Sequence, residues 1–579
     1  MSLQVQARME AVRHRDESQI QLLIRHFLER FLNNEMVSAD EEGGARLLLV
    51  ACTVALPNFF VAVYLWALYH ILFRVRPYWD RVGDHYFFVA YSLAAMGIIT
   101  VFEWDLFFPD LLDLFVLSSL PIPRRRLFLA RIAAISIFTA GFLFIANVFS
   151  TVALVGIDPP SLLRFLAAHI LAVSASGIFA AAFILALQGI LLAVFGAGFF
   201  RRISLALQGL IITVLLVLLC LSPVLAEILP ALVRSGSRWL FYFPPYWFLG
   251  IYQRMMEGPA ALPLYAKLAG RGCVATLLAL GLALLSYPLA YWRRTRQLIE
   301  GPGAHKAQSW AAVQSSRLFH TAFCRISERR AVCHFVGQTL VRVQRYRIYF
   351  VMYGGLGLSL VIAGILRLQV ERGHIRAAFA ADGIRAAIPI VVFWTIAGLR
   401  IAFLSPGDSR AAWIFRSIHG KPALDHLLAA KHWALAWAVA AAVATLAALR
   451  MIEPPELRTM QAFAAQVLVA GGLCLLLADL FFLNVTTIPF TRAHDPERTN
   501  LAIVLLKYAA SVLLLVLFAP YYESWIGANV PHMLAAVAFA AAAHLLLRAW
   551  HRQIVREHLT LLDLEEHEEG FPLRLWLGS

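Results

Sequence analysis

The chain has 579 residues, of which 60% are hydrophobic and only 15% are charged. A soluble globular protein of this size carries about 25% charged residues, because its surface must be covered by polar side chains. The composition therefore excludes an ordinary soluble enzyme and favours a chain whose solvent is largely lipid.

The formal net charge is +15. In a membrane protein, such a charge is explained by loop residues that set topology and contact anionic headgroups, so we expect membrane lipids and no nucleic acid as partners. The six cysteines are scattered, and Cys324, Cys333 and His334 fit no usual zinc spacing. We therefore expect neither a disulfide framework nor a metal site.

The N-terminal segment 1–44 is polar and charged, and the first apolar run is too long for a signal peptide, so we expect no cleaved leader. Within it, residues 18–32 place apolar side chains on one helical face and Arg25, Glu29 and Arg30 on the other. This pattern predicts an amphipathic helix. It lies either in the membrane interface or packed against protein.

Apolar runs long enough to cross a bilayer recur along the chain. They predict an all-α, polytopic integral membrane protein with about 12 transmembrane helices in two pseudo-repeated halves, since spans in lipid must satisfy their own backbone. We find no period-two alternation along the chain, so a β-barrel is not expected. The expected spans are 45–73, 86–108, 127–155, 165–195, 207–229 and 272–292, then 348–366, 386–404, 433–449, 463–484, 501–520 and 530–549.

These spans divide the chain into a first six-span half (45–292), a cytoplasmic linker (293–347), a second half (348–550) and a cytoplasmic tail (551–579). The linker holds eleven Lys and Arg residues, and basic residues favour the inner side of a membrane, so both termini are expected inside. The outer loop 367–385 carries four arginines and argues against this orientation.

Residues 230–262 are too polar to span and too aromatic for a plain loop. The pair Pro244–Pro245 is expected to break any helix there. We predict a broken or re-entrant hairpin that enters the outer leaflet.

The stretch from Glu103 to Ile132 organises the first half. A span ends in acidic residues and a proline, a short amphipathic segment follows, and an arginine cluster begins the next span. We predict that this membrane-surface elbow is a docking surface for a cytoplasmic protein, while its arginines also anchor the topology. Its docking residues are Asp110, Asp113, Pro123, Arg124, Arg125 and Arg126.

The second half repeats this arrangement. Pro406 and Asp408 follow its second span as Pro109 and Asp110 follow that of the first half, and Pro422 precedes the next span as Pro123 does. The offset is nearly constant, at 297 and then 299 residues. Pro406, Asp408 and Pro422 are therefore predicted to form a second docking elbow.

No catalytic or nucleotide-binding motif is found, including the P-loop, so we expect no enzyme activity and no cofactor in this chain. Ionisable residues in spans are functional candidates by default. Glu103, Asp105, Arg400 and Asp479 lie near the expected cytoplasmic span ends. We hypothesise that Arg400 pairs with one of these acids and closes a gate; the alternative is that each charge simply reaches toward the interface.

The parts together resemble the permeases of type-2 ABC exporters. Such permeases have an amphipathic helix before the first span, a coupling elbow between spans two and three, and a re-entrant hairpin between spans five and six; here these are 18–32, 109–126 and 230–262. The phrase DLLDLFVLSSLPIPRRRLFLARI is similar to their D-x-L-x-x-L-P-x-x-x-R-x-x-x-x-A-R run. The second half departs from the plan, because its hairpin region, 520–530, is very short.

The resemblance implies a transport subunit of the bacterial inner membrane. A separate ABC ATPase, carrying ATP and Mg, would dock on the cytoplasmic elbows and drive export. Two alternatives remain open at this point. An ion-coupled secondary transporter requires an ion-binding acid in mid-membrane. A membrane-embedded lipid-processing enzyme, such as a glycosyltransferase that uses a lipid carrier, requires paired acids on an outer loop.

Overall fold

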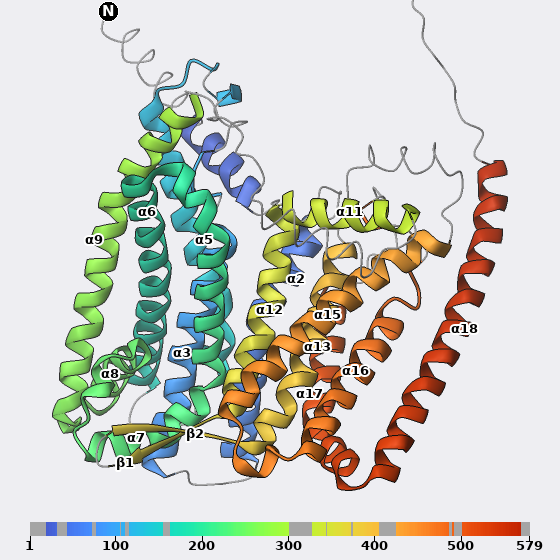
Figure 1. The fold of residues 1–579 in the computed structure, drawn as a ribbon. Coiled ribbons are helices and arrows are strands. Elements are labelled where there is room, and N and C mark those ends of the chain that lie inside the picture. Colours follow the sequence, from blue (N-terminus) through green and yellow to red (C-terminus); the bar gives the residue numbers. More distant parts are fainter. Residues whose placement is uncertain are drawn as a thin grey trace, which may run out of the picture. The chain divides into compact units, whose positions relative to one another are not determined.

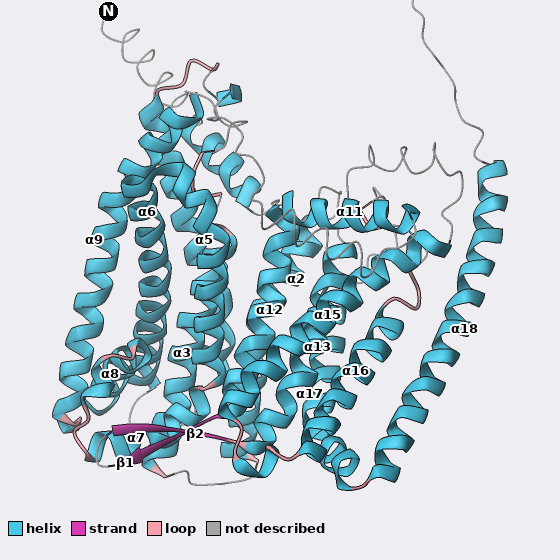
Figure 2. Cartoon of the chain, in the orientation of Figure 1, coloured by secondary structure: helices cyan, strands magenta, loops and turns pink. Residues whose placement is uncertain are grey.

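The chain is almost entirely helical in the described part of the structure (Figures 1 and 2). It divides into two compact units, which are described one at a time: Met1–His305 with Arg367–Ala378, and Lys306–Leu366 with Phe379–Ser579. The computed structural model describes residues 19–31, 43–71, 77–104, 106–109, 115–117, 119–153, 162–299, 327–342, 344–371, 374–404, 424–485, 489–490 and 501–568.

Ten helices in these described ranges are long and apolar enough to cross a membrane, and each overlaps one of the expected spans. The two other expected spans, 45–73 and 348–366, contain the shorter apolar helices Val54–Tyr69 and Val351–Ile365. The chain is therefore an all-α, multi-pass membrane protein, as predicted from its composition.

The first unit begins with a helix at residues 19–31. Its longest elements are the membrane-span helices, and two short helices and two 3-10 turns precede the last of them. In chain order these are α2 (Gly43–His70), α3 (Tyr78–Phe102), α5 (Arg124–Ala153), α6 (Leu162–Cys220), α7 (Ser222–Arg234), η1 (Arg238–Phe241), α8 (Pro244–Glu257), η2 (Gly258–Ala260) and α9 (Pro263–Ile299).

The second unit begins with an amphipathic helix and continues with six longer helices. In chain order these are α11 (Ser327–Arg342), α12 (Gln344–Ile365), α13 (Ala381–Leu404), α15 (Leu424–Ile452), η4 (Pro455–Leu457), α16 (Met460–Phe481), α17 (Leu501–Ala528) and α18 (Val530–Glu568). The strands β1 (Leu366–Glu371) and β2 (His374–Phe379) lie between α12 and α13 in the sequence.

Helix α6 contains two crossings rather than one. Ile184 and Leu215 would lie about 45 Å apart in a straight helix. Yet a Cβ atom placed on Gly97 of α3 would lie 3.4 Å from Ile184 and 2.6 Å from Leu215. The helix must therefore reverse between these two residues, which agrees with the separate spans expected at 165–195 and 207–229.

The aromatic segment after α6 forms two short helices, α7 and α8, joined by the η1 turn. At 13 and 14 residues, each is about 20 Å long and too short to cross a bilayer. Pro244 and Pro245 begin α8 instead of breaking it, because the first helical turn needs no N–H donor from these positions. No helix runs through the proline pair, so the expected interruption is confirmed, with the prolines placed at the start of the second helix. Entry of this segment into the outer leaflet stays a prediction.

The strands β1 and β2 form a two-stranded sheet that we did not expect. The sequence Leu-Arg-Leu-Gln-Val-Glu of β1 alternates apolar and polar residues, and its burial alternates in step. The prediction that no period-two alternation exists is therefore wrong for residues 366–371. A six-residue alternation between two long apolar runs is easily overlooked.

The most buried span of each unit is its second one. In their most apolar windows, 78% of the residues of α3 and 83% of those of α13 are buried, whereas no residue of the α18 window is. In the first unit α3 packs on α5, α6, α7 and α8, and in the second α13 packs on α12, α15, α16 and α17. Each unit is therefore assembled around its second span.

The third spans of the two units bury the same register, which supports the internal repeat. Helix α5 begins at Arg124 and α15 at Leu424. Every fourth residue is buried in both helices: Ala130, Ala134, Phe138 and Phe142 in α5, and Ala430, Ala434, Ala438 and Ala442 in α15.

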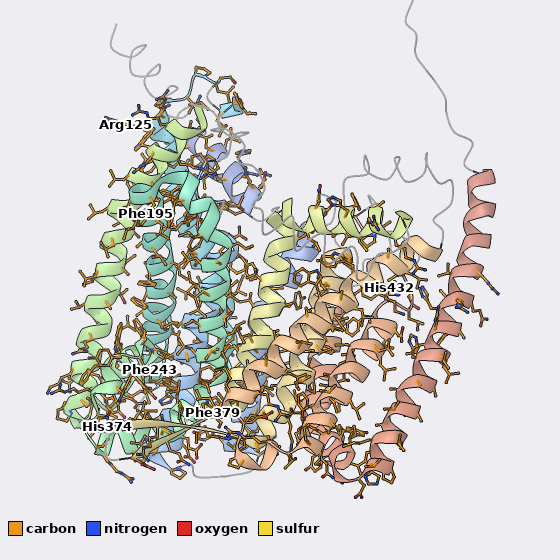
Figure 3. The ribbon with its side chains drawn as sticks, in the orientation of Figure 1. Arg125, Phe195, Phe243, His374, Phe379 and His432 are labelled. Carbon is orange, nitrogen blue, oxygen red and sulfur yellow. The ribbon has the colours of Figure 1, made fainter. Side chains whose placement is uncertain are left out.

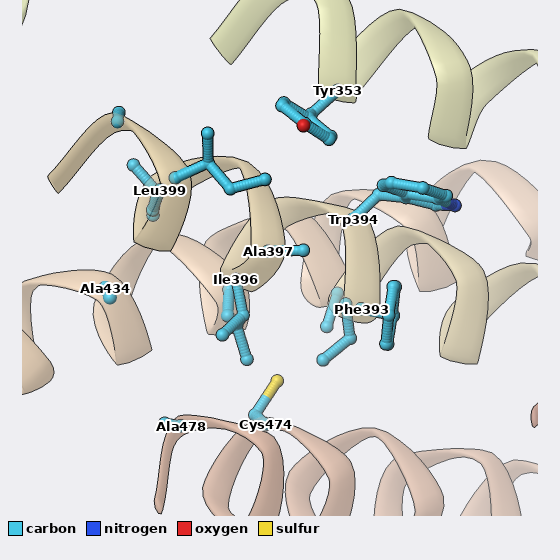
Figure 4. Close-up of a cluster of buried hydrophobic side chains, with 14 of the residues drawn as sticks. Tyr353, Phe393, Trp394, Ile396, Ala397, Leu399, Ala434, Cys474 and Ala478 are labelled. Atoms are coloured by element: carbon cyan, nitrogen blue, oxygen red, sulfur yellow. The ribbon is translucent and has the colours of Figure 1, made fainter. Parts of the chain in front are cut away.

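Helices α12 and α13 cross closely through small residues, as membrane helices commonly do. A Cβ on Gly357 would lie 2.9 Å from the Cβ of Trp394, and one on Gly398 would lie 2.8 Å from the Cβ of Tyr353. The rings of Tyr353 and Trp394 stack with centroids 5.7 Å apart (Figure 4). These glycines therefore set how closely the two helices approach.

Substitution of Gly357 by Ala is predicted to destabilise the protein, because the added methyl group displaces Trp394. Overpacking of this kind costs about 1–3 kcal/mol. Gly354, three residues earlier on α12, has open space around it, so Gly354→Ala is the matched control. Thermal unfolding in detergent should show a clear loss for Gly357→Ala alone. Equal stability of the two variants would contradict the close crossing.

Candidate functional site

The turn that follows α3, residues 103–109, is held by side chains from three other helices. We call it the exit turn; its Asp105 lies outside the described residues. Arg131 of α5 donates through Nη2 to the carbonyl oxygens of Leu106 (2.6 Å) and Phe108 (2.8 Å). The hydroxyl of Tyr287 on α9 donates to the carbonyl of Phe107 at 2.6 Å.

The third donor is Gln188 of α6, whose side-chain amide donates to the carbonyl of Trp104. The carbonyls of a turn that follows a helix have no helical partner, and leaving them buried without a donor is costly. Here side chains of α5, α6 and α9 supply the donors. The exit turn is therefore fixed to all three helices.

The helix at residues 19–31 packs on the same place. Leu23, Phe27 and Phe31, four residues apart, form its buried face. The guanidinium carbon of Arg131 lies 5.2 Å from the centroid of the Phe27 ring. Phe31 contacts the Phe107 ring, with centroids 6.2 Å apart. Of the two interpretations of this amphipathic helix, the structure places its apolar face against protein.

The start of α5 presents the predicted docking residues. The carbonyl of Pro123 accepts from the N–H of Arg126 at 2.9 Å and so begins the helix. Arg126 reaches Gln19 of the N-terminal helix at 3.3 Å, while Arg124 and Arg125 are exposed. Asp110 and Asp113 lie outside the described residues.

Exposed apolar side chains precede these arginines. Phe115 is 71% exposed and Leu120 is 46% exposed. We use the name elbow surface for Phe115, Leu120, Arg124 and Arg125. Figure 3 shows Arg125 at one end of the first unit's helices and Phe243, which precedes α8, at the other. The elbow surface and the α7–α8 pair therefore lie at opposite ends of this unit.

The elbow sequence departs from the permease pattern at its acidic position. Counting back from Pro121, that position falls on Phe115, and the nearest acid is Asp113. The final Ala-Arg of the pattern is Ala130–Arg131, both of which are buried. Sequence reasoning singled out the exposed arginines and missed Arg131, although the pattern itself contains it.

In the second half, Pro406, Asp408 and Pro422 lie outside the described residues, so the second docking elbow stays a prediction. Lys431 stands 300 residues after Arg131, at the same place in the buried register of α15. Its ammonium pairs with Asp479 Oδ1 on α16. The other oxygen, Oδ2, lies 2.6 Å from Nδ1 of His544 on α18.

The predicted gate charges lie as follows. Glu103 is buried at the exit turn, and its carbonyl accepts from the N–H of Leu106 at 3.0 Å. Asp479 is bound by Lys431 and His544. The guanidinium carbon of Arg400 lies 5.8 Å from the centroid of the Phe482 ring. Pairing of Arg400 with an acid stays a prediction.

Lys431 was missed because the expected third span of that half began at residue 433, two residues too late. The internal repeat was the available signal, since it maps Arg131 onto Lys431. His544 was missed because it lies 65 residues from Asp479 in the sequence, and only the fold brings the two together.

A second charged cluster lies at the opposite end of the second unit's helices. Glu453, which follows α15, accepts from Arg450 (3.0 Å) and from Gln466 of α16 (2.9 Å). Glu523 of α17 lies 3.8 Å from Arg385 of α13. Both acids fall just outside the expected spans, which ended at residues 449 and 520. Polar and charged side chains therefore link α15 to α16 and α13 to α17 at that end.

The first unit contains a buried polar network of its own. His169 of α6 lies with Nε2 3.1 Å from Ser150 Oγ and Nδ1 3.2 Å from the hydroxyl of Tyr252. Because Ser150 donates to the carbonyl of Asn147, it accepts from His169 Nε2–H, and Nδ1 accepts from Tyr252. His85 of α3 stacks on the Tyr252 ring. The network joins α3, α5, α6 and α8.

No family model matches the chain, and neither a curated protein nor a solved structure was found to be similar to it. The chain's own residues describe a multi-pass helical membrane protein whose exit turn, after the second span, is held by side chains of three helices.

Replacement of Arg131 by Leu is predicted to destabilise the first unit. Two buried carbonyls would lose their donor, at a cost of about 1–3 kcal/mol each. Arg124→Leu removes the same charge from an exposed position and should change stability by no more than about 0.5 kcal/mol. Thermal unfolding in detergent measures both. Equal effects would show that the contacts of Arg131 with the exit turn contribute little.

Single substitution of Asp479 by Asn or of Lys431 by Met is predicted to cost about 3–5 kcal/mol, because one charge of a buried pair remains. The double variant K431M/D479N should be more stable than either single variant. The matched double variant R400M/D479N tests the gate hypothesis. If it restores stability instead, Arg400 is the main partner of Asp479.

Proposed function

We propose that the chain is the transmembrane permease subunit of an ABC-type exporter, with a separate ATPase docking on its elbow surface. The observation that carries the proposal is the attachment of the exit turn to α5, α6 and α9 through Arg131, Gln188 and Tyr287. A docking elbow has to pass the movement of a partner to the spans. A turn held by buried hydrogen bonds to three helices can do so without bending.

The elbow surface has the composition of a protein-binding site. Aromatic residues and arginine are enriched where proteins meet. Phe115 and Leu120 are apolar and exposed, and Arg124 and Arg125 stand beside them. The packed N-terminal helix adds Gln19, which holds Arg126 at the edge of this surface.

The proposal assigns no covalent chemistry to this chain. ATP and Mg would bind to the partner, and hydrolysis there would move the spans of this subunit. In the proposed topology both termini and the elbow face the cytoplasm of a bacterial cell, and the α7–α8 pair lies toward the outer side.

An ion-coupled secondary transporter is the second candidate, and one observation favours it. The carboxylate of Asp479 is buried and lies against both Lys431 and His544. Intramembrane acids paired with lysine and histidine occur in proton pathways. The secondary-transporter hypothesis predicts transport without an ATPase and loss of transport in D479N.

The deciding experiment is purification of the full chain in mild detergent, together with any ATP-binding-cassette ATPase encoded beside its gene. The variant R124E/R125E reverses the charge of the elbow surface and should reduce the ATPase retained by about tenfold, the effect of ~1.4 kcal/mol. The control R234E/R238E makes the same charge change in exposed arginines at the other end of the unit.

Retention of a stoichiometric ATPase by wild type and control, but not by R124E/R125E, supports the permease. Substrate movement in proteoliposomes that requires a proton or sodium gradient and no ATPase would establish the secondary transporter instead.

A further inference from the structure

The first unit contains an apolar groove whose occupant can be inferred from its wall. Its volume is about 510 Å³, within the range of about 300–1,000 Å³ typical of ligand sites. It lies between α3, α5, α6 and α9, and its lining includes Ile132, Thr139, Ala181 and Leu284. We call it the α5–α9 groove.

Two of its hydroxyl groups are already bonded to backbone carbonyls. Thr100 donates to the carbonyl of Met96 at 2.7 Å, and Tyr287 donates to that of Phe107 at 2.6 Å. A bound water needs two to four polar partners, and most of the remaining wall consists of Ala, Leu, Ile and Phe side chains. The groove is therefore suited to hydrocarbon rather than to water.

The groove is bordered by side chains that face the lipid. Leu284 lines it and is 68% exposed, and Leu280 lines it and is 37% exposed. Both belong to a span of α9, where exposed leucines contact acyl chains. A hydrophobic molecule can thus enter sideways from the bilayer without crossing water.

One end of the groove is formed by Phe107 and Tyr287, the residues joined by the hydrogen bond that holds the exit turn. The ring of Phe128, which also lines the groove, stacks on Tyr287 with centroids 6.0 Å apart. A molecule that fills the groove therefore touches the ring of the residue that fixes the turn.

We propose that the α5–α9 groove binds one long alkyl chain of a lipid-like molecule, and that the bound chain rests against Phe107 and Tyr287. This inference deepens the proposed function, on which it rests for its meaning in transport: the alkyl chain would belong to the substrate. A molecule bound in the groove would therefore act on the exit turn through its contacts with Phe107 and Tyr287.

Photochemical labelling of the full chain in lipid nanodiscs tests the inference. One probe is an 18-carbon fatty acid with a diazirine on its chain, and the other is a phosphatidylcholine with the same group. Mass spectrometry locates the adducts. We expect saturable labelling, at most one adduct per chain, in the peptides of α5 and α9 that line the groove.

Two variants narrow the groove from opposite walls, Ala140→Trp and Leu284→Trp, so the test does not depend on one of them folding. Ile137→Trp and Leu285→Trp are their controls, since these exposed neighbours do not line the groove. Labelling should fall at least about tenfold in the first pair, equivalent to ~1.4 kcal/mol, and persist in the second.

Labelling by the fatty acid alone assigns the groove to single-chain amphiphiles, and labelling by both probes assigns it to membrane lipid; either upholds an alkyl-chain site. Labelling that rises without saturation, or that is equal in all four variants, would overturn the proposal. The assay contains no ATPase, so it can fail while the elbow still binds one, and the converse also holds.

Discussion

The rest of the first unit depends on how the backbone ends its second span. Helix α3 has the most buried apolar window of that unit, so the carbonyls of the exit turn that follows it need donors from the protein itself. The guanidinium group of Arg131 is buried here and donates to two carbonyl oxygens, and it lies over the ring of Phe27. A buried guanidinium with several acceptors and a ring beneath it is a stable arrangement, whereas a lone one is not. These contacts of Arg131 hold both α5 and the N-terminal helix against the exit turn.

The second unit uses the equivalent position differently. Lys431 replaces Arg131, and a lysine offers a point charge instead of a planar fork. It pairs with a carboxylate, Asp479, on the next helix along the chain. The two halves thus share a buried register and a buried cation, but the cation in one binds backbone and in the other binds an acid. This likeness and this difference are what the predicted internal duplication would leave if the two halves diverged afterwards.

Much of the fold could be predicted from the sequence, because lipid imposes long apolar helices and leaves few alternatives. All ten spans of the described chain were anticipated, and so was the amphipathic helix. The failures have local causes. Pro244 and Pro245 interrupt the helix as expected, but the start of α8 at these prolines was not anticipated, although proline is well suited to a first turn. The sheet of β1 and β2 was hidden by its shortness.

The site was harder to predict than the spans. The elbow could be found because its arginines are clustered in the sequence. The side chains that hold the exit turn could not be found in this way. Gln188 and Tyr287 look like ordinary residues of apolar helices, and only the fold brings them to Trp104 and Phe107. His169 was passed over for the same reason: its partners, Ser150 and Tyr252, come from other helices.

The burial of α3 has a consequence for the biosynthesis of the protein. Among the membrane spans of the first unit it has the lowest mean hydropathy, 1.6, against 2.6 for each arm of α6. A span surrounded by protein needs less apolar surface than one surrounded by lipid, and it partitions less readily from the translocon on its own. Helix α3 is therefore expected to insert less efficiently than the more apolar spans when it is made alone. The helices α6, α7 and α8, which are synthesised after it, cover faces that would otherwise contact lipid.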